Sequence, residues 1–241
     1  MRADSCICQG YGWYRACDCP YQDIQHCPDF GKAFPCVCTL QSLFGSRRLL
    51  LHEQCGLADE QRLNLTMDRF DPRRSEDATA MRDLAVRFIT GKGRQWLVLA
   101  GTPGAGKTHI CGAIVNAMVA QMVEAQYITA SDLIIIMRDA ENGIVPDDDP
   151  FVPYSKLLAR YARLPVLVID DLKTDLMTTP ASFRYIEAVL DKRYTEAAAT
   201  VITTNVDPNK VPDRWDSRMR DEMMSAFLVV TPPDVRLEDA S

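Results

Sequence analysis

Apolar and polar residues alternate along most of this chain with the periods of buried strands and amphipathic helices. From about residue 78 onward, short apolar runs are separated by segments in which apolar residues recur every three or four positions. Strands that alternate with helices indicate a mostly parallel sheet with helices on both faces. The predicted fold class is therefore α/β, with strands at 95–100, 125–129, 166–169, 200–204 and 226–230.

Local signals place the helices between these strands. Ser131 is a plausible N-cap for the helix that follows the second strand. Thr179 and Pro180 provide a cap and a proline at the first helical position of a later helix. The apolar side chains expected to point inward from that later helix are Phe183, Ile186, Val189 and Leu190.

The first 58 residues have a different character. Eight of the nine cysteines lie within residues 1–55, and the periodicity there is weak. A polar stretch over 59–77 is interpreted as a linker with some local order. We therefore expect a Cys-rich domain over 1–58, a linker over 59–77 and an α/β domain over 78–241.

Composition and charge restrict the possible classes of protein. The apolar runs are far too short to span a bilayer, and polar residues interrupt the amino terminus where a secretory signal would need an apolar core. We expect a cytoplasmic protein that does not bind membranes. The net charge of −6 argues against a broad basic surface for nucleic acid, although a local basic groove is compatible with it.

A glycine-rich turn carries the strongest chemical signal. The segment 101–108 reads Gly-Thr-Pro-Gly-Ala-Gly-Lys-Thr, follows a predicted strand and opens a predicted helix, which is the context of a P-loop. Gly104 and Gly106 let backbone N–H groups turn toward phosphates, and the helix adds its positive N-terminal dipole. Lys107 is expected to reach the β- and γ-phosphates of ATP, and the Thr108 hydroxyl to bind Mg²⁺. The full predicted cradle is Gly101, Thr102, Pro103, Gly104, Ala105, Gly106, Lys107 and Thr108.

Two further strand ends carry polar groups that suit ATP chemistry. Asp170 and Asp171 directly follow the apolar run at 166–169. Asp170 is expected to hold Mg²⁺, and Asp171 to polarise the attacking water. Asn205 follows the next strand and is expected to detect the γ-phosphate and orient that water. A capping pair of carboxylates and a simple Asn turn are the structural alternatives.

The ordered set of motifs resembles the AAA+ ATPases of the bacterial helicase-loader group, of the DnaC and DnaI type, whose near relative is the IstB transposition helper. The resemblance covers about residues 65–236 and includes Phe70 near its start. Lys173 departs from the glycine that usually follows the acidic pair. The segments that carry the resemblance are 101–108 with His109, 127–133, 168–172, 192–194, 203–205 and 217–218.

The resemblance implies self-association and assigns further residues. Arg218 matches the arginine that completes a neighbouring subunit's site, and Arg193 is expected at the subunit junction. Arg236 matches an arginine that approaches the nucleotide of its own chain, and His109 belongs to the nucleotide-binding set. A solvated helix face is the alternative for Arg218. A head-to-tail contact of this kind generates rings or open spirals.

The cysteines of the first domain are candidate zinc ligands. Four thiolates around Zn²⁺ can stabilise a domain that has little core of its own. An iron–sulfur cluster and free structural thiols are alternatives. The first predicted set is Cys6, Cys8, Cys17 and Cys19, and a second set is Cys27, Cys36 and Cys38 with Cys55 or a histidine.

The sequence is compatible with three functions. The first is a helicase loader that delivers a hexameric replicative helicase onto single-stranded DNA and contacts that helicase through its Cys-rich domain. The second is an IstB-like transposition helper that binds duplex DNA and a transposase. The third is a P-loop kinase for a small metabolite, which the Asn205 and Arg218 positions disfavour.

Overall fold

The computed structural model describes residues 13–14, 33–35, 37–144, 152–173, 180–205 and 218–230. The chain divides into two compact units, Met1–Leu50 and Leu51–Ser241. The described helices and strands before the main sheet are β1 (Trp13–Tyr14), β2 (Phe34–Pro35), α1 (Val37–Gln54), α2 (Asp59–Asn64), the 3-10 helix η2 (Pro72–Arg74) and α3 (Glu76–Ile89). They are followed by β3 (Trp96–Gly101), α4 (Lys107–Ala120), β4 (Ala125–Thr129), α5 (Ala130–Glu141), α6 (Tyr154–Arg163), β5 (Val166–Leu172), α8 (Pro180–Thr195), β6 (Ala199–Thr204) and β7 (Ser225–Val230).

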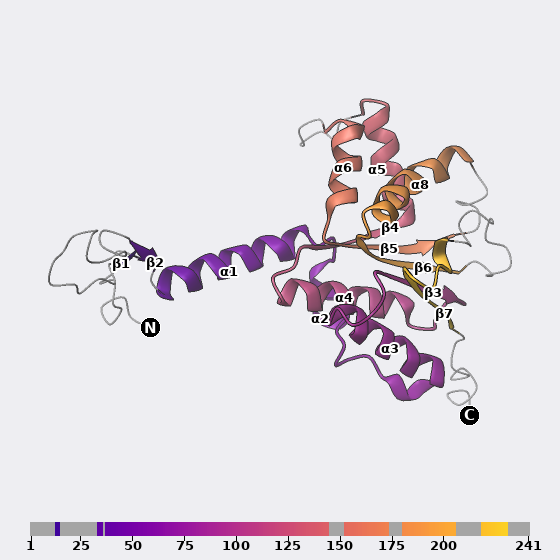
Figure 1. The fold of residues 1–241 in the computed structure, drawn as a ribbon, viewed down its shortest axis with the longest axis horizontal. Helices are drawn as coiled ribbons and strands as arrows, with labels where there is room; N and C mark the ends of the chain where they lie inside the picture. Colours follow the sequence, from indigo (N-terminus) through magenta and orange to yellow (C-terminus); the bar gives the residue numbers. More distant parts are fainter. Residues whose placement is uncertain are drawn as a thin grey trace. The chain divides into compact units, whose positions relative to one another are not determined.

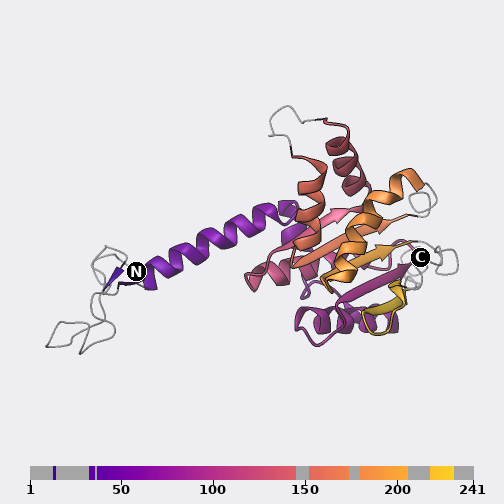
Figure 2. The same cartoon turned by 45° about the horizontal axis from the view of Figure 1, so that its top comes forward.

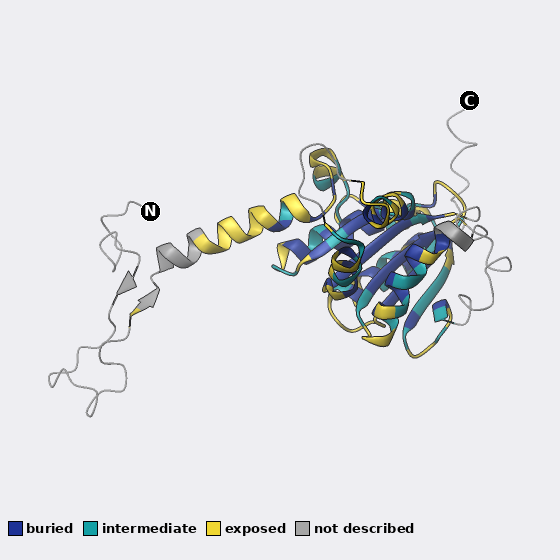
Figure 3. Cartoon of the chain, turned by 90° about the horizontal axis from the view of Figure 1, so that it is seen from above, coloured by how far each residue is buried: buried dark blue, intermediate teal, exposed yellow. Residues whose placement is uncertain are grey.

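The second unit contains a five-stranded sheet in the order β4-β5-β6-β3-β7, and every neighbouring pair is parallel. Helices α3 and α4 lie on one face, and α5, α6 and α8 lie on the other (Figures 1 and 2). The predicted α/β class, with helices on both faces of a parallel sheet, is confirmed. The three inner strands β3, β5 and β6 are covered on both faces, so their residues are almost continuously buried, as the dark strands of Figure 3 show, whereas the edge strands β4 and β7 are more exposed.

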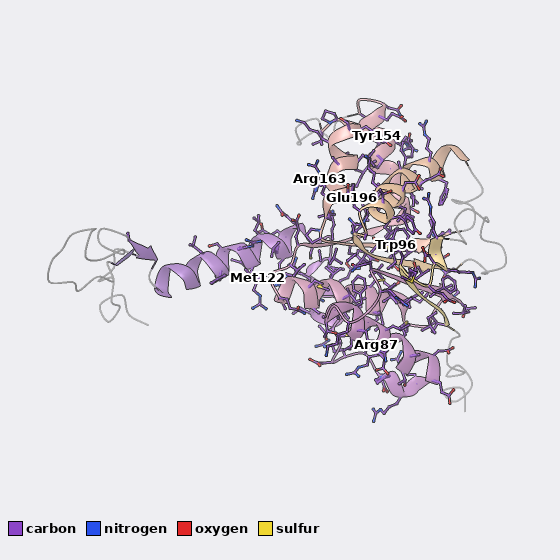
Figure 4. All side chains as sticks on the ribbon, viewed as in Figure 1. Arg87, Trp96, Met122, Tyr154, Arg163 and Glu196 are labelled. Carbon is purple, nitrogen blue, oxygen red and sulfur yellow. The ribbon has the colours of Figure 1, made fainter. Side chains whose placement is uncertain are left out.

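Each face of the sheet packs into its own apolar cluster. On the α5–α6–α8 side, Trp96 (labelled in Figure 4) is fully buried. Its ring forms a T-shaped contact with the ring of Tyr194, with 5.7 Å between centroids. On the α3–α4 side, Phe70, Met81 and Ile110 belong to the second cluster. All four apolar residues predicted to point inward from α8 are buried.

The helix after β4 begins earlier than predicted. Thr129, and not Ser131, is the N-cap of α5, because its hydroxyl oxygen accepts a hydrogen bond of 3.1 Å from the backbone N–H of Asp132. Both residues can cap a helix, and the end of the strand decides which one does so. Pro180 is the first residue of α8, as predicted.

The division between the two units falls earlier than the predicted boundary at residue 58. Leu51, Cys55 and Leu57 are buried in the same apolar cluster as the P-loop helix α4. The predicted linker over 59–77 includes α2 and η2, and Phe70 within it is also buried. These apolar side chains join the core of the second unit, so residues 51–77 pack as part of the α/β fold and are not a linker between two domains.

Arg193 has a different role from the predicted one at a subunit junction. It is completely buried at the end of α8. Its guanidinium donates to the hydroxyl of Thr200 at 3.0 Å and to the carbonyl oxygens of Tyr161, Ala162, Leu164 and Ala199 at 2.5–3.2 Å. Burial lowers the pKa of Arg193 to about 10. The residue therefore holds the end of α6 against the start of β6.

No helix in the described part of the chain is long and apolar enough to cross a bilayer.

Candidate functional site

The predicted nucleotide residues meet at the carboxyl edge of the sheet. The loop 102–106 follows β3, Asp170 and Asp171 lie at the end of β5, and Asn205 follows β6. Because these three strands are adjacent and parallel, their carboxyl ends open onto one place. A cavity of about 310 Å³ there is lined by Pro103, Gly104, Gly106, Lys107, Thr108, Asp170, Asp171, Thr203 and Asn205.

The loop has the backbone conformation that a phosphate cradle requires. Gly104 and Gly106 have φ values of 88° and 92°, a region that only glycine adopts readily. Gly106 is also the N-cap of α4, so the free N–H groups of the first helical turn open onto the cavity. An anion in this loop would lie at the positive end of α4.

Lys107 is held close to the cavity by three acceptors. Its Nζ donates to the carbonyl oxygens of Gly101 and Thr102 at 2.7 and 2.8 Å, and to Oδ1 of Asn205 at 2.8 Å. Burial lowers the pKa of Lys107, and the neighbouring Asp170 opposes this shift. Phosphate oxygens are stronger acceptors than these neutral ones, since they carry charge.

Asp170 is fixed by hydroxyl groups from three elements. Its Oδ2 accepts hydrogen bonds from Thr108 at 2.9 Å and from Tyr127 at 2.7 Å, and its Oδ1 accepts one from Thr203. Asp170 is 3% exposed, so this carboxylate is both buried and oriented. No local pattern points to a role for Tyr127, whereas the polar Thr203 at the end of a buried strand is a signal that the sequence offers.

Asp171 differs from Asp170 in its backbone and its surroundings. Its φ is 58°, in the left-handed region, at the point where the β5–β6 register shifts between Ile169 and Leu172. Its carboxylate accepts a hydrogen bond from Nδ2 of Asn205 at 2.9 Å and pairs with Nζ of Lys173 at 3.1 Å. Unusual backbone geometry of this kind often accompanies function.

The cavity also has the oxygen ligands that Mg²⁺ requires. Mg²⁺ prefers oxygen ligands, and a P-loop hydroxyl with a carboxylate is a common protein contribution to its shell. The Thr108 hydroxyl and the Asp170 carboxylate are already 2.9 Å apart at one edge of the cavity. The residues present therefore fit a magnesium–nucleotide complex.

Two of the predicted site residues, His109 and Arg218, lie away from the cavity, and a third has no described position. His109 does not line the cavity: its Nε2 lies 2.9 Å from the carbonyl oxygen of Thr66, and its ring packs beside Phe70. Arg218 precedes β7, at the amino ends of the parallel strands, and pairs with Asp191 at the end of α8. Arg236 lies outside the described residues.

Most of the predicted zinc ligands also lie outside the described residues, and of Cys38 only the helical backbone is described. Cys55 is described: it is 1% exposed, and its Sγ donates to the carbonyl oxygen of His52 at 3.0 Å. This apolar environment favours a core role for Cys55 over metal ligation. Within the described ranges, no group of three or more His, Cys, Asp or Glu side chains is placed to hold a metal ion.

Solved structures share this fold. The DnaC helicase loader superposes with a TM-score of 0.59 at 21% identity, over 72% of this chain and 99% of that one. DnaI gives a TM-score of 0.57 at 19% identity, over 76% and 96% of the two chains. DnaA from Aquifex aeolicus, bound to AMPPCP, gives 0.57 at 18% identity over 70% and 50%. At these identities the similarity demonstrates the fold alone.

Sequence comparison identifies the family. An insertion sequence IS5376 putative ATP-binding protein from Geobacillus stearothermophilus is 32% identical over 167 residues, which is 68% of this chain and 60% of that protein. The match therefore spans only part of that relative's length. The family model of the IstB-like ATP binding protein matches residues 52–230, which include every described residue of the cavity. This chain belongs to the family of IstB-like ATP-binding proteins, with the AAA+ type of P-loop fold.

Proposed function

We propose that this chain is an ATPase of the AAA+ type that uses ATP to control its assembly and its action on DNA. The observation that supports this most directly is the convergence of Lys107, Asp171 and Asn205, together with Thr108 and Asp170, on one cavity. A P-loop alone supports nucleotide binding. Hydrolysis also requires groups that act on the attacking water, and these are the Asp171 carboxylate and the Asn205 amide.

Each residue has a role that follows from its contacts. The N–H groups of the loop and Lys107 would bind the phosphates. Thr108 and Asp170 would hold Mg²⁺, which, when bound, neutralises charge on the β- and γ-phosphates. Asp171 would accept the proton of the attacking water, and Asn205 would orient that water because it already bridges Lys107 and Asp171.

Nucleotide binding requires a rearrangement of Lys107. Its Nζ now donates to the two carbonyl oxygens and to Asn205, and it must exchange some of these acceptors for phosphate oxygens. That exchange would release Oδ1 of Asn205 while its Nδ2 still contacts Asp171. Asn205 would therefore respond to the occupancy of the loop and pass that response to the catalytic carboxylate.

We propose that Arg218 acts on the nucleotide of a neighbouring chain. It lies at the opposite edge of the sheet from its own P-loop, so it cannot serve its own site without a large movement. An arginine supplied by a neighbour stabilises charge on the γ-phosphoryl group in the transition state. Arg236 is proposed as a nucleotide contact within the same chain.

We propose two alternative partners, a hexameric helicase with single-stranded DNA or a transposase with duplex DNA. Delivery of a hexameric helicase onto single-stranded DNA is favoured by the Cys-rich first domain, which matches DnaI-type loaders only in its cysteine content. A transposition helper role on duplex DNA is favoured by the 32% identity to the insertion-sequence ATP-binding protein. Both roles need the same ATP-controlled assembly.

One set of binding measurements separates the two. Single-stranded and duplex DNA of equal length would be titrated with the protein in the presence of a non-hydrolysable ATP analogue. A preference for single strands, with co-purification of a hexameric helicase, supports the loader role. A preference for duplex supports the helper role. Absence of both ATP hydrolysis and ATP-dependent self-association would overturn the shared proposal.

We also propose that the first unit is a zinc-stabilised partner domain. Cys6, Cys8, Cys17 and Cys19 would form the first site, and Cys27, Cys36 and Cys38 with a histidine the second. Elemental analysis of the whole chain, repeated on Cys17→Ser, tests this. A folded chain that contains no zinc would contradict the proposal.

A further inference from the structure

Tyr127 is contacted on its backbone by the segment that follows α1. The backbone N–H of Tyr127 donates to the carbonyl oxygen of Cys55 at 2.8 Å. Gly56 has a φ of 76°, and a Cβ added there would lie 2.1 Å from the carbonyl oxygen of Tyr127. Only glycine allows this approach. The Cys55–Gly56 junction, which consists of these two residues between α1 and α2, therefore packs directly against the edge strand β4.

The side chain of the same residue reaches the metal-binding carboxylate. Tyr127 OH donates to Oδ2 of Asp170 at 2.7 Å, and Tyr127 is buried. A tyrosine hydroxyl is uncharged near neutral pH, so it serves as the donor to this carboxylate.

The oxygen that Tyr127 contacts is the one that faces the P-loop. Oδ2 of Asp170 accepts from Thr108 as well as from Tyr127, whereas Thr203 donates to the other oxygen. Tyr127 thus helps to fix the position of Asp170 relative to the Thr108 hydroxyl. Groups that orient a metal-binding carboxylate in this way contribute to metal affinity without touching the metal.

We propose that Tyr127 is a positioning residue that connects the Cys55–Gly56 junction to Asp170. The position of this junction against β4 would then control Mg²⁺-dependent nucleotide binding. This inference rests on the proposed nucleotide function. The junction follows directly on α1, the helix that leads from the first unit into the second. A partner that moved the end of α1 would change the metal site through two hydrogen bonds, Cys55–Tyr127 and Tyr127–Asp170.

The test compares nucleotide affinity with and without the metal. The dissociation constant of ADP would be measured by calorimetry on the full chain, once with Mg²⁺ and once with EDTA. Tyr127→Phe removes only the hydroxyl. We expect it to reduce the gain in affinity due to Mg²⁺ by about 10-fold, the lower end for removal of a group that supports a metal ligand. The affinity in EDTA should stay unchanged.

Gly56→Ala tests the connection to the junction. It changes a residue that does not line the nucleotide cavity, yet the added Cβ must push Tyr127 or the junction away. We expect the same selective loss of the Mg²⁺ effect. Both variants would act through the Tyr127–Asp170 hydrogen bond. The Mg²⁺ effect in the double variant should therefore fall by no more than in the more affected single variant.

Two matched controls separate this effect from general damage. Tyr161→Phe removes a hydroxyl from a tyrosine buried in the other apolar cluster. Gly143→Ala places alanine at a φ of 71° where an added Cβ meets nothing within 4 Å. Both should keep the full Mg²⁺ effect.

The outcomes are distinct. If the natural chain binds ADP without any Mg²⁺ effect, the proposed metal site fails. If it shows the effect and Tyr127→Phe retains it, the positioning role is wrong. Additive losses in the double variant, or an unaffected Gly56→Ala chain, would overturn the connection to the junction.

Discussion

Asn205 and Lys107 are joined by a hydrogen bond of 2.8 Å, from the lysine Nζ to the amide oxygen. The two residues are 98 positions apart, and the bond exists because β6 lies next to β3 in the sheet. The other end of the amide donates to Asp171. A single side chain therefore contacts both Lys107, the group proposed to bind phosphate, and Asp171, the group proposed to activate water.

Asn205→Ala should bind ATP nearly as well as the natural chain but hydrolyse it about 100-fold more slowly. The reason is that the loop and Lys107 remain, whereas the group that orients water toward the γ-phosphate is lost, and removal of one such group typically costs this much. Single-turnover hydrolysis and equilibrium binding would separate the two effects. Asn142→Ala, at the exposed end of α5, is the matched control. Equal losses of binding and turnover would contradict this role.

Mixing two inactive variants should restore ATP turnover. Arg218→Ala lacks the proposed arginine but keeps Asp171, whereas Asp171→Asn keeps the arginine. Random pairing in an equimolar mixture makes about a quarter of the head-to-tail interfaces complete. Each variant alone should be at least about 1,000-fold slower than the natural chain if the arginine acts as in related phosphoryl transfer. A mixture that stays inactive, although both variants bind ATP and assemble, would refute action on a neighbour.

Arg193→Met should lower the free energy of unfolding by about 3 kcal/mol or more, because several buried carbonyl oxygens lose their donor. Urea denaturation measures this directly. Arg163→Met, on the exposed face of α6 (Figure 4), should change stability by only about 0.5 kcal/mol. If Arg193→Met instead left the free energy of unfolding unchanged and impaired only self-association, Arg193 would act at the subunit junction, as the resemblance implies.

Lys173→Gly, which introduces the glycine that usually follows the acidic pair in the helicase-loader group that the sequence resembles, should change turnover by less than about 5-fold. The Lys173 side chain is 51% exposed, and ion pairs at such positions contribute at most about 1 kcal/mol. Steady-state kinetics at low and high salt would measure the effect. A loss of 100-fold would show that Lys173 contacts the reacting phosphate and does more than pair with Asp171.

The sequence by itself determined the α/β class and the position of the phosphate-binding loop, because both depend on local patterns. Apolar runs with helical segments between them dictate buried parallel strands, and Gly104 and Gly106 allow positive φ without help from the rest of the chain. Polar residues at strand ends pointed to Asp170, Asp171 and Asn205, since parallel strands end at one edge.

Only the tertiary structure decided which side chains support these groups. Tyr127 reaches Asp170 because β4 pairs with β5, and Arg193 is buried because α6 and β6 meet at its guanidinium. The order β4-β5-β6-β3-β7 is not the order of the chain, so no local pattern reveals these contacts. For the same reason, only packing against α4 shows that residues 51–77 belong to the ATP-binding fold.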